Sequence, residues 1–377
     1  MNIIITELTP KTILYVGGFI LPDRNAAAQR VVTIAKALRD IGYEVVFFNV
    51  SPYSDNTDWR EIQYYGFKCF ERRQENGRFK GFGIDHVKKF VSNTNTVKAV
   101  IAYNYPTIGL IRLKRFCKSH NISCIGDVTE WYRSRDKNRI VRLLKDAAIE
   151  YRMRVVQKRL NGIIVISDYL ENYYRNSTKI VNIPPLVDKE DDKWKCLIEE
   201  HTDVRFIYAG SPNQMKERLD QIVDIIIELR KCHNVNLAIV GISLEEFLQI
   251  YDYEAEKIRA SDCISFLGRI PHKEVIKLVS NADYSFIIRD RNRITTAGFP
   301  TKFVESISCG TAVITNDNSC ISKYLSEGKN GILVSQETLK EDVEDLLNRK
   351  IKPTVERETF DYRKHNNRLK NFMGMLC

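Results

Sequence analysis

One stretch decides the fold: Gly298-Phe-Pro-Thr-Lys302-Phe-Val-Glu305-Ser-Ile-Ser-Cys-Gly310-Thr-Ala-Val-Ile314-Thr-Asn316. It predicts a loop, a short helix, a turn and a buried strand in succession. Pro300 suits the first position of a helix, where its missing N–H costs nothing, and Gly310 supplies the C-terminal stop. The apolar run over 312–315 is typical of a buried strand. The stretch is therefore a helix–turn–strand unit of an α/β fold.

The start of this helix predicts an anion-binding site. Backbone N–H groups at a helix N-terminus attract phosphate, and Lys302 adds a cation there. Glu305, about one turn further along, can accept hydrogen bonds from hydroxyl groups. Phosphate beside vicinal hydroxyls is what a nucleotide or a nucleotide-sugar presents. The predicted contacts are Gly298, Phe299, Pro300, Thr301, Lys302 and Glu305.

The same stretch resembles a known family. Residues 300–314 are similar to the donor-site helix of the retaining glycosyltransferases of family 4, which have the GT-B fold. In that family a glutamate at the position of Glu305 binds the ribose hydroxyls of the nucleotide. A second glutamate usually lies eight residues earlier, where this chain has Ala297. For this stretch alone, the helix–turn–strand of an unrelated α/β protein remains the alternative.

Other parts of the second half resemble the donor site of this family. A strand over 204–210 ends in Gly210, and Lys216 matches the lysine that binds the donor diphosphate in the family. Ser211 replaces the usual arginine, so the resemblance implies that Arg218 or another cation takes its place. Arg289 precedes Gly298 in the loop where a diphosphate would lie. Without the resemblance, these loops would be interpreted as solvated surface.

The first half begins as a doubly wound domain. A buried strand over 12–16 leads into Gly17-Gly18, and Asn25 can cap a helix that runs to about Arg39. The dinucleotide fingerprint G-x-G-x-x-G is missing. The loop around Gly18 resembles the first-strand loop of the same glycosyltransferases, which faces the donor phosphates and the acceptor. We therefore expect Gly18 to contact the donor.

Two acidic residues follow a strand predicted over 123–128. Asp127 and Glu130 lie at the carboxyl end of this strand, where open α/β sheets bind ligands. They are the first half's candidates for contacting a sugar or an acceptor hydroxyl. Helix capping is an equally good interpretation of both residues.

A basic amphipathic stretch over 131–160 indicates an anionic partner. Residues 1–185 hold 30 Lys and Arg against 17 Asp and Glu, a balance of +13, and the remainder balances to −3. Apolar residues at helical spacing, with Trp131 and Tyr132 as interfacial anchors, would suit an anionic membrane surface. A solvated surface helix is the alternative. Nucleic acid is not expected, because no aromatic–basic recognition motif is present.

Composition sets the remaining limits. A chain of 377 residues has room for two or three domains. No apolar run reaches the about 20 residues of a membrane helix, and the N-terminus has no signal-peptide pattern. Nine scattered cysteines without metal-ligand spacing indicate reduced thiols. We expect a cytoplasmic protein that can rest on the inner face of the membrane.

The predicted fold class is α/β, with two doubly wound Rossmann-like domains facing each other across a cleft. The expected boundaries are 1–187 for acceptor binding and 188–351 for nucleotide-sugar binding. A C-terminal helix within 352–377 is expected to cross back to the first domain.

The resemblance implies transfer of a sugar from a nucleotide-diphosphate sugar, such as a UDP-sugar, to a hydroxyl of a glycan or lipid-linked acceptor, with retention of configuration. Such a reaction would serve bacterial surface polysaccharide or glycoconjugate synthesis. The candidates for catalysis are Asp127, Glu130, Lys216 and Lys302. We expect no cofactor and no metal, and we expect Lys302 to line the cleft without a role in folding. The alternatives are a GT-B epimerase or phosphorylase, and a non-catalytic binder of nucleotide-sugars or nucleic acid, which the alanine at 297 would favour.

Overall fold

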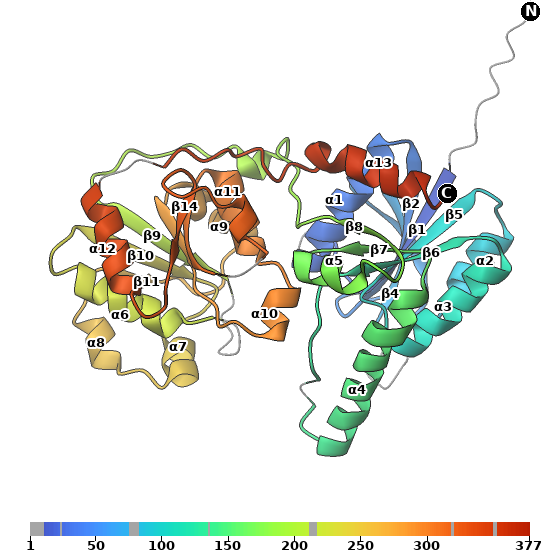
Figure 1. Ribbon diagram of the computed structural model, residues 1–377, viewed down its shortest axis with the longest axis horizontal. Coiled ribbons are helices and arrows are strands. Elements are labelled where there is room, and N and C mark those ends of the chain that lie inside the picture. The colour runs from blue at the N-terminus through green and yellow to red at the C-terminus, as the bar shows by residue number, and fades with distance from the viewer. Residues whose placement is uncertain are drawn as a thin grey trace, which may run out of the picture. The chain divides into compact units, whose positions relative to one another are not determined.

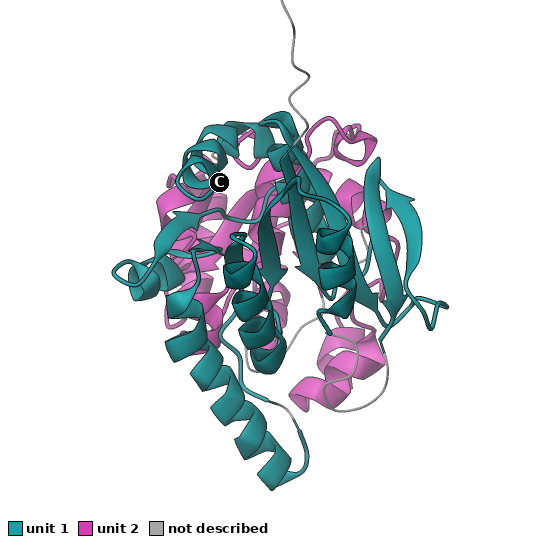
Figure 2. Ribbon diagram, turned by 90° about the vertical axis from the view of Figure 1, so that its right-hand side faces the viewer, with its two compact units in different colours: residues 1–186, 362–377 teal, residues 187–361 magenta. Residues whose placement is uncertain are grey.

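The computed structural model describes two compact α/β units. The first unit comprises residues 1–186 and 362–377, and the second comprises residues 187–361 (Figure 2). The description covers residues 11–22, 25–74, 83–134, 136–210, 217–317, 320–349 and 353–377. Lys216, one of the predicted catalytic residues, lies outside the described residues, as do Ser211 and Arg135.

Unit 1 is built on an eight-stranded sheet in its described part, in the order β3-β4-β2-β1-β5-β6-β7-β8. All neighbouring strands are parallel except β3 and β4, which form an antiparallel pair at one edge. The strands are β1 (Lys11–Gly17), β2 (Tyr43–Ser51), β3 (Arg60–Tyr64), β4 (Phe67–Arg73), β5 (Val97–Tyr103), β6 (Ser123–Val128), β7 (Gly162–Val165) and β8 (Lys179–Asn182).

Helices cover both faces of this sheet (Figure 1). Side chains alternate along β1, so that Ile13 and Tyr15 enter one core with α1 and α13, while Leu14 and Val16 enter a second core with α2 and α3. The helices of unit 1 are α1 (Ala26–Asp40), α2 (Asp85–Ser92), α3 (Thr107–Ser119), α4 (Arg139–Tyr151), α5 (Asp168–Tyr174) and α13 (Asn366–Gly374). Burial on both faces is what the near-continuous apolar runs of parallel strands require.

The C-terminal segment belongs to unit 1. A 3₁₀ turn over Tyr362–His365 precedes α13, which is shorter than the helix expected within 352–377. Leu369 and Phe372 are buried in the same core as α1, and Ser123 donates a hydrogen bond of 2.6 Å to the carbonyl of Leu376. The last residues therefore complete one face of the first sheet.

Unit 2 is a six-stranded parallel sheet, as far as the chain is described, in the order β11-β10-β9-β12-β13-β14. The strands are β9 (Val204–Ala209), β10 (Val235–Val240), β11 (Ile264–Phe266), β12 (Tyr284–Ile287), β13 (Ala312–Asn316) and β14 (Gly331–Val334). The helices are α6 (Leu219–Leu229), α7 (Leu244–Tyr251), α8 (Ala255–Arg259), α9 (His272–Ser280), α10 (Arg293–Ala297), α11 (Thr301–Cys309) and α12 (Leu339–Arg349). Both sheets confirm the predicted α/β class with two doubly wound units.

Local signals placed several elements correctly. Asn25 caps α1 by accepting a hydrogen bond of 2.8 Å from the N–H of Ala28, as predicted. Pro300 directly precedes α11, and Gly310 ends it in a left-handed conformation with φ of 89°. The helix predicted from Trp131 is different, because α4 begins only after Asn138, whose side chain caps it. In the described ranges, no helix combines the length and the apolar character needed to cross a membrane.

Candidate donor site and the comparisons that identify its family

The first turn of α11 is fixed by aromatic packing. Phe299 is 8% exposed, and its ring contacts those of Phe303, Tyr324 and Phe360 at centroid distances of 5.9 to 6.2 Å. This cluster holds the loop before α11 against unit 2. The structure thus makes the Phe299 ring part of the core of unit 2, and a contact of Phe299 with the donor stays a prediction. Gly298 and Pro300 are buried as well, while Thr301 is partly exposed.

Lys302 forms a buried ion pair that the sequence did not reveal. Its Nζ lies 2.7 Å from Oε2 of Glu217, and the two side chains are 13% and 10% exposed. Tyr208 donates a hydrogen bond to the same carboxylate oxygen, and the Nζ lies 3.7 Å from the centroid of the Tyr208 ring. A Cβ at Gly210 would lie 2.8 Å from Cε of Lys302, so a glycine is needed there for this approach. This buried ion pair gives Lys302 a structural contact, which speaks against the expectation that its removal would leave folding unaffected.

The charges in this cluster shift one another's pKa. Burial alone would raise the pKa of Glu217, but the charge of Lys302 and the hydrogen bonds from Lys302 and Tyr208 outweigh it, so the pKa of Glu217 lies below its usual value. Burial lowers the pKa of Lys302, and Glu217 offsets part of this effect. The positive charge of Arg289 lowers the pKa of both groups. The cluster is thus a compact, cation-rich site next to the start of α11.

Glu305 is held by a histidine on another helix. Its Oε1 lies 3.0 Å from Nε2 of His272, the first residue of α9. Glu305 is 16% exposed and His272 is 27% exposed, so the pair can be reached by a ligand. Nothing in the sequence indicates this contact, because His272 and Glu305 are 33 positions apart. Glu305 and Lys302 lie one turn apart on α11.

Two predicted cations of the donor loop have other partners. The guanidinium of Arg218 binds Asp220 through Nε and Nη2, at 3.1 and 2.8 Å. Arg289 is buried, and its backbone exchanges two hydrogen bonds with the side chain of Asn316, at 2.9 and 2.8 Å. The charge of Arg289 thus acts on Lys302 and Glu217, whereas Arg218, the residue before α6, pairs with Asp220 in the first turn of that helix.

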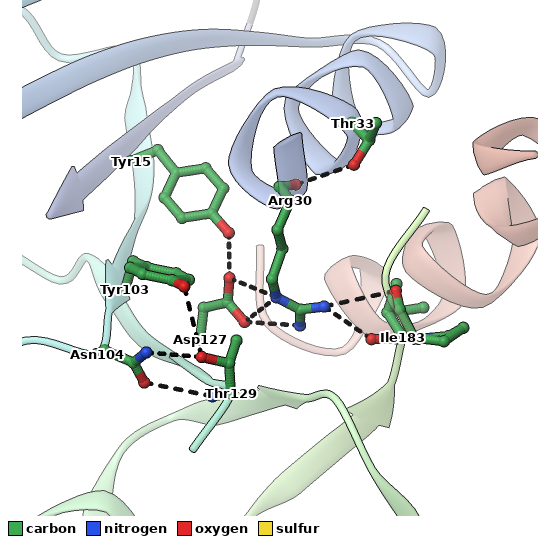
Figure 3. A network of polar contacts seen from close by, with 9 residues as sticks. Tyr15, Arg30, Thr33, Tyr103, Asn104, Asp127, Thr129 and Ile183 are labelled. Carbon is green, nitrogen blue, oxygen red and sulfur yellow. Dashed lines mark hydrogen bonds and ion pairs between the residues drawn. The ribbon is translucent and has the colours of Figure 1, made fainter. Parts of the chain in front are cut away.

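Asp127 occupies the interior of unit 1. Its carboxylate is fully buried and accepts hydrogen bonds from Nε and Nη2 of Arg30, at 2.9 and 2.7 Å, and from the hydroxyl of Tyr15 (Figure 3). Arg30 in turn donates to the carbonyl of Ile183 at 2.9 Å. Both carboxylate oxygens are therefore engaged. The prediction that Asp127 contacts a sugar is corrected: it is the counter-ion that ties β6 to α1 and to the chain after β8.

The carboxyl end of β5 and β6 carries further polar groups. Asn104 donates a hydrogen bond of 2.6 Å to the hydroxyl of Thr129 (Figure 3), and Glu130 follows as a partly exposed residue. Gly18, after β1, is also partly exposed. These residues line the edge where a parallel sheet binds ligands. Glu130 and Gly18 remain predictions.

No group of three or more His, Cys, Asp and Glu side chains that could hold a metal ion occurs among the described residues. The cation-rich cluster around Lys302 is instead suited to an anion, and Glu305 is suited to hydroxyl groups.

Residues 188–366 match the family model described as "Glycosyl transferases group 1". This part of the chain is a group 1 glycosyltransferase domain. It contains α11, Lys302, Glu305, His272 and Glu217, so the whole cluster described above lies within the matched segment. The predicted resemblance to GT-B glycosyltransferases is confirmed at the level of group 1, whereas family 4 and retention of configuration stay predictions.

Solved structures share the fold over the whole chain. Sucrose-phosphate synthase from Thermosynechococcus elongatus has 15% identity and a TM-score of 0.61, covering 97% of this chain and 95% of its own. HepE from Anabaena, in complex with UDP, has 13% identity and a TM-score of 0.64, covering 97% and 100%. The pneumococcal O-GlcNAc transferase GtfA, in complex with UDP and GlcNAc, has 12% identity and a TM-score of 0.63, covering 97% and 99%. No curated protein sequence matches the chain. The group 1 domain and its N-terminal partner unit thus have the GT-B fold.

Proposed function

We propose that this glycosyltransferase moves a sugar from a nucleotide-diphosphate sugar, most simply a UDP-sugar, to a hydroxyl of a glycan or lipid-linked acceptor, with retention of configuration. The observation that carries the proposal is the arrangement of Lys302 and Glu305 one turn apart at the start of α11 inside the group 1 domain. HepE has been solved with UDP-glucose as well as with UDP, and GtfA with UDP and GlcNAc. These complexes support a UDP-sugar as the donor.

In this proposal the diphosphate binds at the N-terminus of α11. The helix dipole and Lys302 attract it, and it competes with the Glu217 carboxylate for the Lys302 ammonium group. A diphosphate carries more negative charge than one carboxylate, so it is the stronger partner. Glu305, held by His272 at 3.0 Å, accepts hydrogen bonds from the ribose hydroxyls. Lys216 is the further cation that the resemblance assigns to the diphosphate.

The chemical step breaks the bond between the anomeric carbon and the diphosphate oxygen. The acceptor oxygen forms its bond to that carbon on the same face, and the acceptor proton passes to the departing phosphate. Negative charge develops on the diphosphate, and Lys302 and the α11 N-terminus stabilise it where it forms. No metal ion takes part in this scheme, and Glu130 is the proposed contact for the acceptor.

The exposed face of α4 is the proposed contact with a membrane. Ile140, Leu143 and Leu144 are 71%, 62% and 68% exposed, although a soluble surface rarely groups large apolar side chains in this way. Arg139 and Arg142 are exposed beside them. Such a helix suits an anionic lipid surface, where a lipid-linked acceptor would be presented. We propose a role in the synthesis of surface polysaccharides or glycoconjugates on this basis.

Trp131 does not contribute to this face. It is 1% exposed, and its indole N–H donates a hydrogen bond of 3.0 Å to Glu150. The prediction that Trp131 anchors the helix at an interface is therefore wrong, because the residue packs inside unit 1.

The experiment that tests the proposed reaction is incubation with a panel of UDP-sugars and glycan acceptors. Release of UDP and formation of a glycoside are measured together, and proton NMR of the product gives the anomeric configuration. Transfer with the configuration of the donor supports the proposal. A product with inverted configuration, or binding of UDP-sugars without transfer to any acceptor, would contradict it.

A further inference from the structure

Arg152 is the residue at which the α-helical hydrogen bonding of α4 gives way to a π-helical turn. α4 ends at Tyr151, and the chain continues as a π-helical turn over Arg152–Val156. Such turns are rare and are frequently found at functional sites. Arg152 is only 2% exposed, so its guanidinium is a charge buried inside unit 1.

The guanidinium is held from one side. Its Nη1 donates hydrogen bonds to the carbonyls of Asn104 and Tyr105, at 3.0 and 3.1 Å, and the ring of Tyr132 lies 5.7 Å from its Cζ. Within the described ranges, neither Nε nor Nη2 has a hydrogen-bond partner. A buried charged donor without a partner is costly and needs a reason.

Three other arginines of this chain show what the Nε–Nη2 edge binds. Each uses the same two nitrogens to hold a carboxylate: Arg30 holds Asp127, Arg218 holds Asp220 and Arg230 holds Asp262. This edge of a guanidinium matches the paired oxygens of a carboxylate or a phosphate.

The nearest acid on the same helix serves other residues. Glu150 accepts hydrogen bonds from the indole of Trp131 and from Arg154, at 3.0 and 2.7 Å. It does not pair with Arg152. The Nε–Nη2 edge of Arg152 is therefore oriented by two backbone carbonyls and directed at no acid of the described chain.

We propose that Arg152 binds an oxyanion group of the acceptor, either a phosphate or a carboxylate. Asn104 and Tyr105 directly follow β5, so the site lies at the carboxyl end of the unit 1 sheet, the end at which open α/β sheets bind ligands. The half-buried ring of Tyr132 moves aside by side-chain rotation when the anion binds. That the ligand is an acceptor rests on the proposed function, whereas the anion site itself does not.

The test is a titration of the full chain, labelled with ¹⁵N at its three tryptophans, with methyl phosphate and separately with acetate. Trp131 is adjacent to Tyr132, and its indole N–H reports on the site. Trp59 in unit 1 and Trp194 in unit 2 serve as internal controls. A saturable shift of the Trp131 signal alone is expected, and the anion that causes it shows whether the site takes phosphate or carboxylate. Sodium chloride at the same ionic strength corrects for screening.

Arg152→Gln should weaken this binding by on the order of tenfold to hundredfold, the loss expected for charge-assisted hydrogen bonds. The control Arg159→Gln removes the same charge from an exposed position and should leave anion binding unchanged. The proposal is overturned if the Trp131 signal of the wild type responds to neither anion, or responds equally to sodium chloride. The titration of the wild type tests the anion site even if the Arg152→Gln variant does not fold. Because the titration contains no donor, its result does not depend on whether the protein transfers a sugar.

Discussion

Lys302 has a structural contact and a proposed chemical role at the start of α11. Its Nζ neutralises Glu217 at 2.7 Å, and the proposed donor diphosphate would take over that contact. Lys302→Ala should lower turnover by on the order of 10²–10³, the loss typical of one electrostatic stabiliser. It should also lower the free energy of unfolding by about 3 kcal/mol, because a largely buried carboxylate loses its partner. Steady-state kinetics and urea unfolding measure the two effects.

The double variant Lys302→Ala with Glu217→Gln separates these two effects. Replacing the carboxylate by an amide removes the unpaired charge, so stability should recover while turnover stays low. Unchanged turnover in a folded Lys302→Ala variant would rule out the phosphate role of this lysine.

Glu217 gives unit 2 a defined response to acid. Its pKa in the folded state lies below the ordinary value of 4.5, so the ionised carboxylate favours folding. This contribution is present above the ordinary pKa and is lost as the pH falls through the lowered one. Glu217→Gln should therefore reduce the loss of stability on acidification below about pH 4.5. Urea unfolding over this range tests it, with Glu341→Gln on the exposed surface of α12 as the matched control. Identical acid profiles for Glu217→Gln and the wild type would exclude this linkage.

At the scale of elements, α4 stands out because its side chains Ile140, Leu143 and Leu144 are 71%, 62% and 68% exposed. In unit 1 it extends away from the sheet (Figure 1), and of its 13 residues only Ile149 is buried. Arg139→Glu with Arg142→Glu should weaken binding to anionic vesicles by about 2 kcal/mol or more, since each basic residue near such a surface contributes about 1 kcal/mol. Co-sedimentation at low and high salt measures the effect.

One control variant and one further assay sharpen this test. Lys277→Glu with Lys340→Glu makes the same change of charge on exposed positions of unit 2 and should leave vesicle binding as in the wild type. Transfer to a short soluble acceptor should survive in both double variants. A wild-type protein that ignores anionic vesicles at low salt would refute the membrane contact and leave α4 as a solvated helix.

A comparison of α11 with α4 shows why local sequence signals predict some helix boundaries and miss others. α11 was predictable, because Pro300, the apolar spacing and Gly310 act within one short segment. The start of α4 was not, because the amphipathic pattern from Trp131 onward does not reveal which residues pack inside. Trp131 is buried and lies before the helix. α4 begins at Arg139, after the capping residue Asn138.

Contacts between distant positions escaped prediction for a related reason. Lys302 and Glu305 were found as candidates because their spacing on one helix is visible in the sequence. The partner of Lys302 lies 85 positions away, and the partner of Asp127 lies 97 positions away. Only the folded sheets bring these charges together, so Asp127 was mistaken for an exposed ligand contact. The β3–β4 pair at the edge of unit 1 was likewise not foreseen.

At the scale of the whole molecule, the two units differ in net charge and in their match to the family model. The positive excess lies in the first half of the chain, whereas the group 1 domain is the matched segment 188–366. This division supports different partners for the two units: an anionic surface or acceptor for unit 1 and a nucleotide-sugar for unit 2. The nucleotide-sugar site of unit 2 matters most, because the proposed chemistry requires a nucleoside diphosphate bound at α11.

Calorimetric titration with nucleoside diphosphates, with UDP first, tests for this site. We expect that UDP binds with or without EDTA, that uridine binds far more weakly, and that UDP at 100 times its Kd stabilises the chain by about 2.7 kcal/mol. Glu305→Gln should weaken UDP binding by about 1.5–3 kcal/mol through its hydrogen bonds to the ribose. Absence of binding by every nucleoside diphosphate, or equal affinity for UDP and uridine, would rule out the proposed diphosphate site at α11.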